Sequence, residues 1–297
     1  MKVILKLMTK TGLFIVSFVF IILFHPSLSQ AEGSDLSTVQ TQKEDNDINK
    51  KPPEREVKLD KEYFTGYWTD TKNILTSPAR WETTDWIKAS AIMGISVGLY
   101  TQDGKIQTWV QKNKNDTNSH LADDASTAYR YVLPVLGGLG LYGYIADDER
   151  AKRTFLLSAE SFILTGIFVQ TLKHTTGRHR PYTGDPYDTW SGPTRNSSYL
   201  SFPSGDASTA FAIASVVASE YDNIVVPTLA YTTASLIALE RVYNNAHWSS
   251  DIFVGSAIGY FTGKAIVASH RNASGSNLSV VPLLDAKNVG LLVTYKY

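Results

Sequence analysis

The chain of 297 residues contains no cysteine, which excludes disulfide bonds, thiol catalysis and zinc sites built on cysteine. It also lacks any excess of charge, because 28 basic and 28 acidic side chains cancel to a formal net charge of zero. Without a basic bias, nucleic acid is not an expected partner. Apolar side chains, in contrast, make up 43% of the residues, which is enough for a sizeable core.

The first 31 residues contain no acidic side chain. Three lysines precede the apolar run 13–24, and the small side chains of Ser29 and Ala31 come just before Glu32. This order predicts a secretory signal peptide over residues 1–31, with an uncleaved membrane anchor as the alternative. Both interpretations place the protein outside the cytoplasm, in a bacterial periplasm or cell envelope.

Aromatic side chains are absent from residues 32–58, which are rich in Glu, Asp, Lys, Gln and Ser. This composition is typical of a disordered linker. Aromatic residues then gather in the segment 59–81, among them Tyr63, Phe64 and Trp68. We expect an amphipathic helix here that either lies on a membrane surface or caps the core.

Between residues 82 and 270, no apolar run reaches the roughly 20 residues of a typical membrane-spanning helix. The uncharged stretches 131–146 and 223–239 come closest, so hydropathy leaves both a soluble and a membrane bundle open. Glu160 interrupts the apolar run 155–169 and must either be buried against a partner or lie in a soluble environment.

The apolar pattern predicts an all-α domain over residues 82–270, a bundle of about six core helices. The predicted helices cover residues 84–100, 106–111, 125–146, 149–173, 206–221, 224–241 and 249–269. Residues 271–297 change to a period of two and predict a short C-terminal β-hairpin with a turn at 285–288.

Glycine recurs at a spacing of four residues, in Gly94 and Gly98 and again in Gly255, Gly259 and Gly263. Because glycine has no Cβ, the backbones of two helices can approach closely at such positions. We therefore expect helix contacts at both groups of glycines, in a soluble or a membrane bundle.

Three segments carry the polar side chains typical of a reaction site. The first, residues 173–181, ends an apolar helix and combines three permanent cations with two histidines. These side chains are Lys173, His174, Arg178, His179 and Arg180. Taken alone, the segment is equally compatible with a basic helix end stabilised by the helix dipole.

The second segment, Pro203-Ser-Gly-Asp206, comes directly before a helix of small residues. Free backbone N–H groups and the Ser204 hydroxyl would cradle phosphate oxygens there, although Ser204 could equally be an ordinary N-cap. The third segment runs from Arg241 to Asp251. His247 and Asp251 can share a helix face, so the carboxylate can accept one imidazole proton and leave the other nitrogen as a nucleophile. A structural histidine capped by an aspartate is the alternative.

Together the three segments offer cations, a helix N-terminus and an oriented histidine, which suit a tetrahedral oxyanion. Their order, Lys-x6-Arg-Pro, Pro-Ser-Gly-x and Arg-x5-His-x3-Asp, resembles the signature of the type 2 phosphatidic acid phosphatase and vanadium haloperoxidase superfamily. The resemblance covers residues 173–251 and is compatible with a helical bundle over about 84–269. It does not cover the chain before residue 80 or the C-terminal hairpin.

The resemblance implies a role for each matching residue. His247 would attack phosphorus to form a phosphohistidine, and Asp251 would orient His247. Neither a metal nor another cofactor is implied. The phosphate-binding residues would be Lys173, Arg180, Ser204, Gly205 and Arg241.

Two positions depart from the family pattern. Asp206 stands where family members usually have the histidine that protonates the leaving oxygen, and Glu240 stands where serine commonly precedes the arginine. We interpret Asp206 as the acid, although His174 or His179 could replace it, or the enzyme could be slow or inactive. Glu240 would either orient Arg241 or weaken its hold on phosphate.

These inferences predict an exported, metal-independent phosphatase for phosphomonoesters or diphosphates. A membrane lipid is the favoured substrate, such as a phosphatidate, a polyprenyl diphosphate or a lipid A phosphate, and the loop 182–200 is expected to line the entrance. The alternatives are a broad-specificity soluble periplasmic acid phosphatase, a haloperoxidase with vanadate on His247, and an inactive phosphate-binding homologue.

Overall fold

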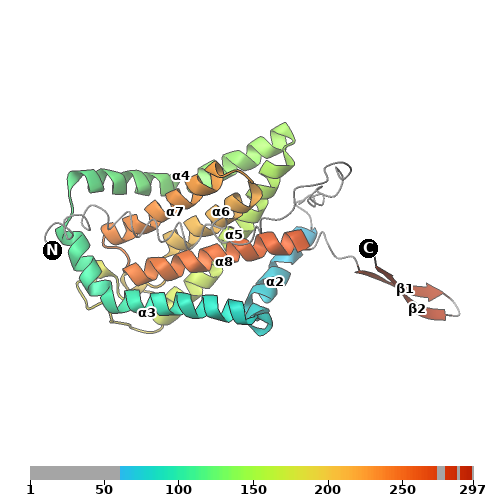
Figure 1. Cartoon of the computed structure of the whole chain (residues 1–297), viewed down its shortest axis with the longest axis horizontal. Coiled ribbons are helices and arrows are strands. Elements are labelled where there is room, and N and C mark those ends of the chain that lie inside the picture. The colour runs from blue at the N-terminus through green and yellow to red at the C-terminus, as the bar shows by residue number, and fades with distance from the viewer. Residues whose placement is uncertain (1–60, 273–277, 286–287, 296–297) are drawn as a thin grey trace, which may run out of the picture.

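The computed structural model describes residues 61–272, 278–285 and 288–295. The predicted signal peptide and linker, residues 1–31 and 32–58, lie outside the described residues. From residue 61 to residue 272 the described chain is all-α, as the apolar pattern predicted (Figure 1).

The helical part begins with the aromatic segment and continues through long helices, with a long connection between α5 and α6 and short ones elsewhere. The elements are α2 (Lys61–Thr76), η2 (Ser77–Arg80), α3 (Thr83–Lys112), α4 (Asp116–Ala146), α5 (Glu149–Thr176), η3 (Pro181–Thr183), η4 (Ser197–Tyr199), α6 (Gly205–Glu220), α7 (Val225–Tyr243) and α8 (Ser249–Asn272).

Helix α6 lies inside the bundle and packs against α5, α7 and α8 (Figure 1). Its side chains are mostly Ala, Ser and Val, and nearly all of them are buried. A helix that is small and apolar all round can be enclosed on every side. The main core cluster joins α6 to α7 and α8 around Phe211, Tyr231 and Phe253.

The three glycines of α8 lie against the backbone of α6, as their spacing predicted. A Cβ at Gly255 would come within 2.5 Å of the Ser204 carbonyl oxygen, and one at Gly263 within 2.6 Å of the Ala212 carbonyl oxygen. Side chains at these positions would force the helices apart. Because the glycines have no side chain, the Pro-Ser-Gly turn can pack against the first turns of α8.

Two of the helix predictions need correction in α3. The segments 84–100 and 106–111 form one continuous helix of 30 residues, because the polar Asp103 is buried in a side-chain network rather than placed at a break. Gly94 and Gly98 make no close helix contact, since an added Cβ at either would meet no atom within 4 Å in the described structure.

Helix α4 begins at Asp116, earlier than the predicted residue 125. Its N-cap is Asn115, whose side chain accepts a hydrogen bond from the backbone N–H of Asn118. The first turns of α4 are polar, so hydrophobic periodicity alone does not reveal them.

Beyond the helices, the chain forms strands β1 (Leu278–Asp285) and β2 (Asn288–Tyr295). The two strands pair antiparallel, with Leu278 opposite Tyr295 and Asp285 opposite Asn288. This register is the one that a turn at 285–288 requires.

Candidate active site

The three polar segments meet at one end of the bundle. The backbone N–H of Ser204 donates to the Asp251 carbonyl oxygen over 3.0 Å, which joins the start of α6 to the start of α8. The backbone N–H of Ser201 donates to the Arg178 carbonyl oxygen, also over 3.0 Å, which joins the same turn to the chain after α5. Segments far apart in sequence therefore share one site.

His247 is buried in the turn between α7 and α8. Its Nδ1 lies 2.7 Å from the Ser201 carbonyl oxygen, and its Nε2 lies 3.2 Å from a guanidinium nitrogen of Arg180. Because a guanidinium can only donate, Nε2 accepts and Nδ1 carries the proton that it donates to Ser201. Burial lowers the pKa of His247 to about 4, with Lys173 and Arg180 acting in the same direction. The imidazole is therefore neutral at pH 7, with a lone pair on Nε2.

Asp251 orients His247 less directly than the sequence suggested. Its Oδ2 lies 3.8 Å from the imidazole Nδ1, which is too long for a hydrogen bond. The same oxygen accepts hydrogen bonds from the Ser201 hydroxyl at 2.5 Å and from the Trp248 backbone N–H at 3.0 Å. Asp251 thus fixes Ser201, and the Ser201 carbonyl oxygen fixes the imidazole.

Arg178 is fully buried between two buried carboxylates. Its guanidinium donates to Asp251 at 2.6 Å and to Asp103 of α3 at 2.8 Å, and the ring of Tyr100 lies 4.9 Å from it. Sequence reasoning gave Arg178 no role and missed Asp103 altogether. The sequence signal for Asp103 was an acidic residue between two apolar stretches. From hydrophobic periodicity alone, such a residue is interpreted as a break between two helices.

Lys173 and Arg180 have no carboxylate partner within residues 61–272. Lys173 donates to the Leu200 carbonyl oxygen at 2.6 Å, and Arg180 donates to the carbonyl oxygens of Leu200 at 3.2 Å and Ala246 at 3.1 Å. A Cβ at Gly205 would lie 3.6 Å from the Lys173 Cε, which places this lysine beside the start of α6. Both charges therefore remain available to an anion near His247.

Arg241 differs from these two cations because acids already surround it. Its guanidinium pairs with both carboxylate oxygens of Glu240 and donates to Asp206 at 2.9 Å. Glu240 also accepts from the side-chain amide of Asn244. Glu240 therefore both orients Arg241 and competes with any phosphate for it.

The Pro-Ser-Gly turn begins α6. The Ser204 hydroxyl caps the helix by accepting from the Ala207 backbone N–H at 3.4 Å, so the N-cap interpretation holds. As an acceptor, the hydroxyl keeps its own proton for donation. Gly205 is the first helical residue, where backbone N–H groups have no partner within the helix.

The two histidines considered as alternative acids are engaged elsewhere. Both ring nitrogens of His179 have partners, Asp185 at 2.7 Å and the Ser191 hydroxyl at 2.6 Å. His174 is exposed, and its Nδ1 lies 2.8 Å from the Thr194 carbonyl oxygen. Both contacts tether the loop 182–200 beside the site.

Comparison with known proteins gives matches over the same region. Residues 154–274 match the family model described as PAP2 superfamily. The lipid A 1-phosphatase of Porphyromonas gingivalis is 30% identical over 137 residues, which are 45% of this chain and 28% of that relative. The chain thus covers well under two thirds of the relative's length.

Two solved structures are similar in part. One is LpxE of Aquifex aeolicus, at 24% identity and a TM-score of 0.42, covering 56% of this chain and 94% of that one. The other is a transmembrane PAP2 type phosphatidylglycerolphosphate phosphatase of Bacillus subtilis, at 12% identity and a TM-score of 0.44, covering 71% of this chain and 95% of that one.

The family match begins within α5 and contains every motif residue from Lys173 to Asp251, in agreement with the resemblance seen in the sequence. Residues 154–274 of this chain are therefore similar to the PAP2 superfamily.

Proposed function

We propose that this protein is a metal-independent phosphatase that hydrolyses lipid phosphates through a phosphohistidine on His247. The observation that carries the proposal is a neutral, oriented imidazole beside Lys173 and Arg180, two cations without an acid partner in the described structure. Such cations hold a phosphoryl group against the nucleophile and stabilise the charge of the transition state.

In the first step, the lone pair of His247 Nε2 attacks phosphorus and the bond from phosphorus to the leaving oxygen breaks. The Nδ1 proton stays on the ring and continues to donate to the Ser201 carbonyl oxygen. Lys173, Arg180, the Ser204 hydroxyl and the Gly205 amide bind the phosphate oxygens. Water then attacks phosphorus, the nitrogen–phosphorus bond breaks, and inorganic phosphate leaves.

Asp206 is proposed as the acid that protonates the leaving oxygen. In the structure its carboxylate accepts from Arg241, so it must first take up a proton. A phosphate that binds Arg241 would replace Asp206 on the guanidinium, and a neighbouring anion favours the protonated form of a carboxyl group. Arg241 would thereby join Lys173 and Arg180 in binding phosphate.

A membrane location is supported by the outer surface of the bundle. Large apolar side chains are exposed along α3, α4, α5 and α7, whereas soluble monomers rarely expose extended apolar surface. Helices α5 and α8 are long and apolar enough to cross a membrane. Examples of the exposed side chains are Trp86, Ile87, Met93, Val97, Tyr131, Val135, Leu141, Ile145, Ile163, Ile167, Val225 and Leu229.

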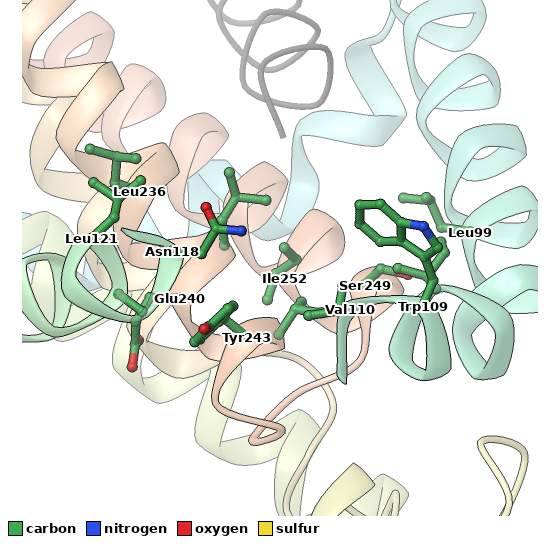
Figure 2. A pocket seen from close by; sticks show the side chains of 14 residues that line it. Leu99, Trp109, Val110, Asn118, Leu121, Leu236, Glu240, Tyr243, Ser249 and Ile252 are labelled. Atoms are coloured by element: carbon green, nitrogen blue, oxygen red, sulfur yellow. The ribbon is translucent and has the colours of Figure 1, made fainter. Parts of the chain in front are cut away.

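A lipid substrate is supported by an apolar cavity of about 140 Å³ between α3, α4, α7 and α8 (Figure 2). Leu99, Leu236 and Ile252 line the cavity. Glu240 and Ser249 also line it, so one side of the cavity lies next to the turn between α7 and α8 that contains His247. A dry cavity of about this size accepts a benzene-sized group. It therefore suits a segment of an acyl chain whose phosphate lies at His247.

The proposal is tested with the full chain purified in detergent and assayed on lipid A 1-phosphate, phosphatidate, a polyprenyl diphosphate and p-nitrophenyl phosphate. We expect phosphate release from a lipid, trapped phosphohistidine in acid-quenched samples, and a loss of at least about 1,000-fold in His247→Ala. His120→Ala, which removes an exposed histidine of α4, is the matched control and should retain activity.

Turnover of p-nitrophenyl phosphate alone, by chain recovered without detergent, would favour a soluble acid phosphatase. Equal activity in His247→Ala and wild type would exclude the phosphohistidine. Labelled His247 without turnover would indicate impaired release.

A further inference from the structure

A second buried charge cluster lies where α2, α5 and α8 meet, far from His247. It consists of Asp70 of α2, Glu160 of α5 and His270 of α8. The His270 Nε2 lies 3.0 Å from a carboxylate oxygen of Glu160 and 3.5 Å from one of Asp70. One ligand atom from each residue lies within 4.8 Å of the others.

The charges of this cluster do not balance. Asp70 is 4% exposed and Glu160 is 0% exposed, yet neither forms an ion pair with a lysine or arginine in the part of the chain that the structure describes. Even with His270 protonated, the two carboxylates leave a net charge of −1. Burying uncompensated charge is strongly unfavourable, so either a proton shared by the two carboxyl groups or a bound cation must cancel the excess here.

The hydrogen bonds of the cluster also leave one carboxylate oxygen without a partner in the described structure. The Glu160 Oε2 pairs with His270, but the Glu160 Oε1 is buried and has no hydrogen-bond partner in the described structure. Asp70 is held by the Ser269 hydroxyl, which keeps its carboxylate facing the cluster. A buried carboxylate oxygen without a donor is rare in folded proteins and points to a ligand.

We propose that Asp70, Glu160 and His270 bind a divalent first-row cation such as Zn²⁺ or Mn²⁺. Carboxylate oxygens and an imidazole nitrogen are ligands that both ions accept, and Zn²⁺ holds them at about 2.0–2.2 Å. With a neutral His270, a divalent cation cancels both carboxylate charges. It also satisfies the unpaired oxygen of Glu160 after a small closure of the three side chains.

The cation would fasten the aromatic helix α2 to the bundle. Asp70 is the ligand that α2 supplies. It lies about two turns from Tyr63 on the same face of the helix, and the Tyr63 hydroxyl donates to the Leu156 carbonyl oxygen of α5 at 2.8 Å. The site lies at the end of α8 opposite Asp251, about 30 Å along a helix that rises about 1.5 Å per residue. It is therefore structural and takes no part in phosphoryl transfer.

The experiment uses the full chain, purified in detergent without chelator, and does not depend on phosphatase activity. Metal analysis by mass spectrometry should find about one Zn²⁺ or Mn²⁺ per chain, and a chelator should lower Tm by roughly 5 °C, with recovery when the ion returns. Asp70→Asn and His270→Gln should lose the ion and the response to chelator. Asp124→Asn, an exposed acid on α4, is the control.

Wild-type protein that carries no metal and whose Tm does not rise with added ZnCl₂ or MnCl₂ would overturn the proposal. So would an ion that both cluster variants retain at full stoichiometry. The wild-type measurements decide the matter even if a variant does not fold.

Discussion

Helix α8 begins at one buried charge cluster and ends at another, and the two clusters differ in which charged groups lack a partner of opposite charge. At its start, Lys173 and Arg180 lie near His247 without a carboxylate partner in the described structure. At its end, Asp70 and Glu160 share His270 as their charged partner among the described residues. The two cations without an acid partner suit an anionic substrate, and the two acids at the other end suit a cation.

The buried cations near His247, at the start of α8, are of two kinds. Arg178 is balanced by Asp103 and Asp251 and acts as part of the scaffold, because it is fully buried and faces no open site. Lys173 and Arg180 donate to backbone carbonyl oxygens, and Arg180 also to His247, rather than to a carboxylate, which leaves their charge for a ligand. The partner of a buried cation thus helps to distinguish a structural charge such as Arg178 from a charge that is available to a ligand.

The largest effect is expected when Arg178 is replaced by Met. Asp103 and Asp251 would then lie buried without their cation, as the acids do at the other end of α8. Breaking a buried ion pair in this way costs about 3–5 kcal/mol. Since Ser201 also loses its fixed anchor, kcat should fall by about 100-fold at a nearly unchanged KM. Thermal unfolding and steady-state kinetics would measure both.

Arg178→Lys should recover part of the activity, because it keeps a charge but cannot bridge both carboxylates. Arg195→Met, which removes an exposed arginine of the loop, should behave like wild type. A folded Arg178→Met protein with wild-type kcat would show that the Asp251 and Ser201 arrangement does not position His247.

The next largest effect is expected in the pH dependence of the reaction, which involves His247 as the nucleophile and Asp206 as the proton donor. His247 must be neutral to attack, and its pKa is lowered from the usual 6.5 to about 4. We therefore expect kcat/KM to hold down to about pH 4 and to fall about tenfold per unit below it. Asp206→Asn should keep this acid limb and lower kcat by about 100-fold.

Profiles recorded from about pH 3 to about pH 9 for wild type, Asp206→Asn and the exposed control Asp124→Asn would test both expectations. A profile of Asp206→Asn identical to that of wild type would remove Asp206 from the mechanism.

The smallest effect is expected at Glu240, the acid that pairs with Arg241. Glu240→Ser should free the guanidinium for phosphate and tighten inhibition by inorganic phosphate roughly three- to tenfold, about 1 kcal/mol. Inhibition constants measured with wild type and with Asn244→Ser, a neighbour of Glu240, provide the comparison. Weaker inhibition in Glu240→Ser would mean that the acid orients Arg241 more than it competes.

Much of the candidate active site around His247 could be predicted from the sequence because its residues occur in short motifs. The spacing within Lys173 to Pro181 and within Arg241 to Asp251 is set by a helix end and a turn, so local rules apply. The spacing of the glycines in α8 likewise predicted a close helix contact, although Gly94 and Gly98 have the same spacing and make no such contact in the described structure. Spacing alone does not say which face of a helix has a neighbour.

By itself, the sequence determined the all-α character of the helical domain, the family motifs and the absence of cysteine chemistry, since all of these follow from composition, periodicity and local spacing. The tertiary structure decided the partners: Asp103 for Arg178, the Ser201 carbonyl oxygen for His247, and the meeting of Asp70, Glu160 and His270. These contacts join residues tens of positions apart, and a buried pair depends on how the helices pack, which no local pattern encodes.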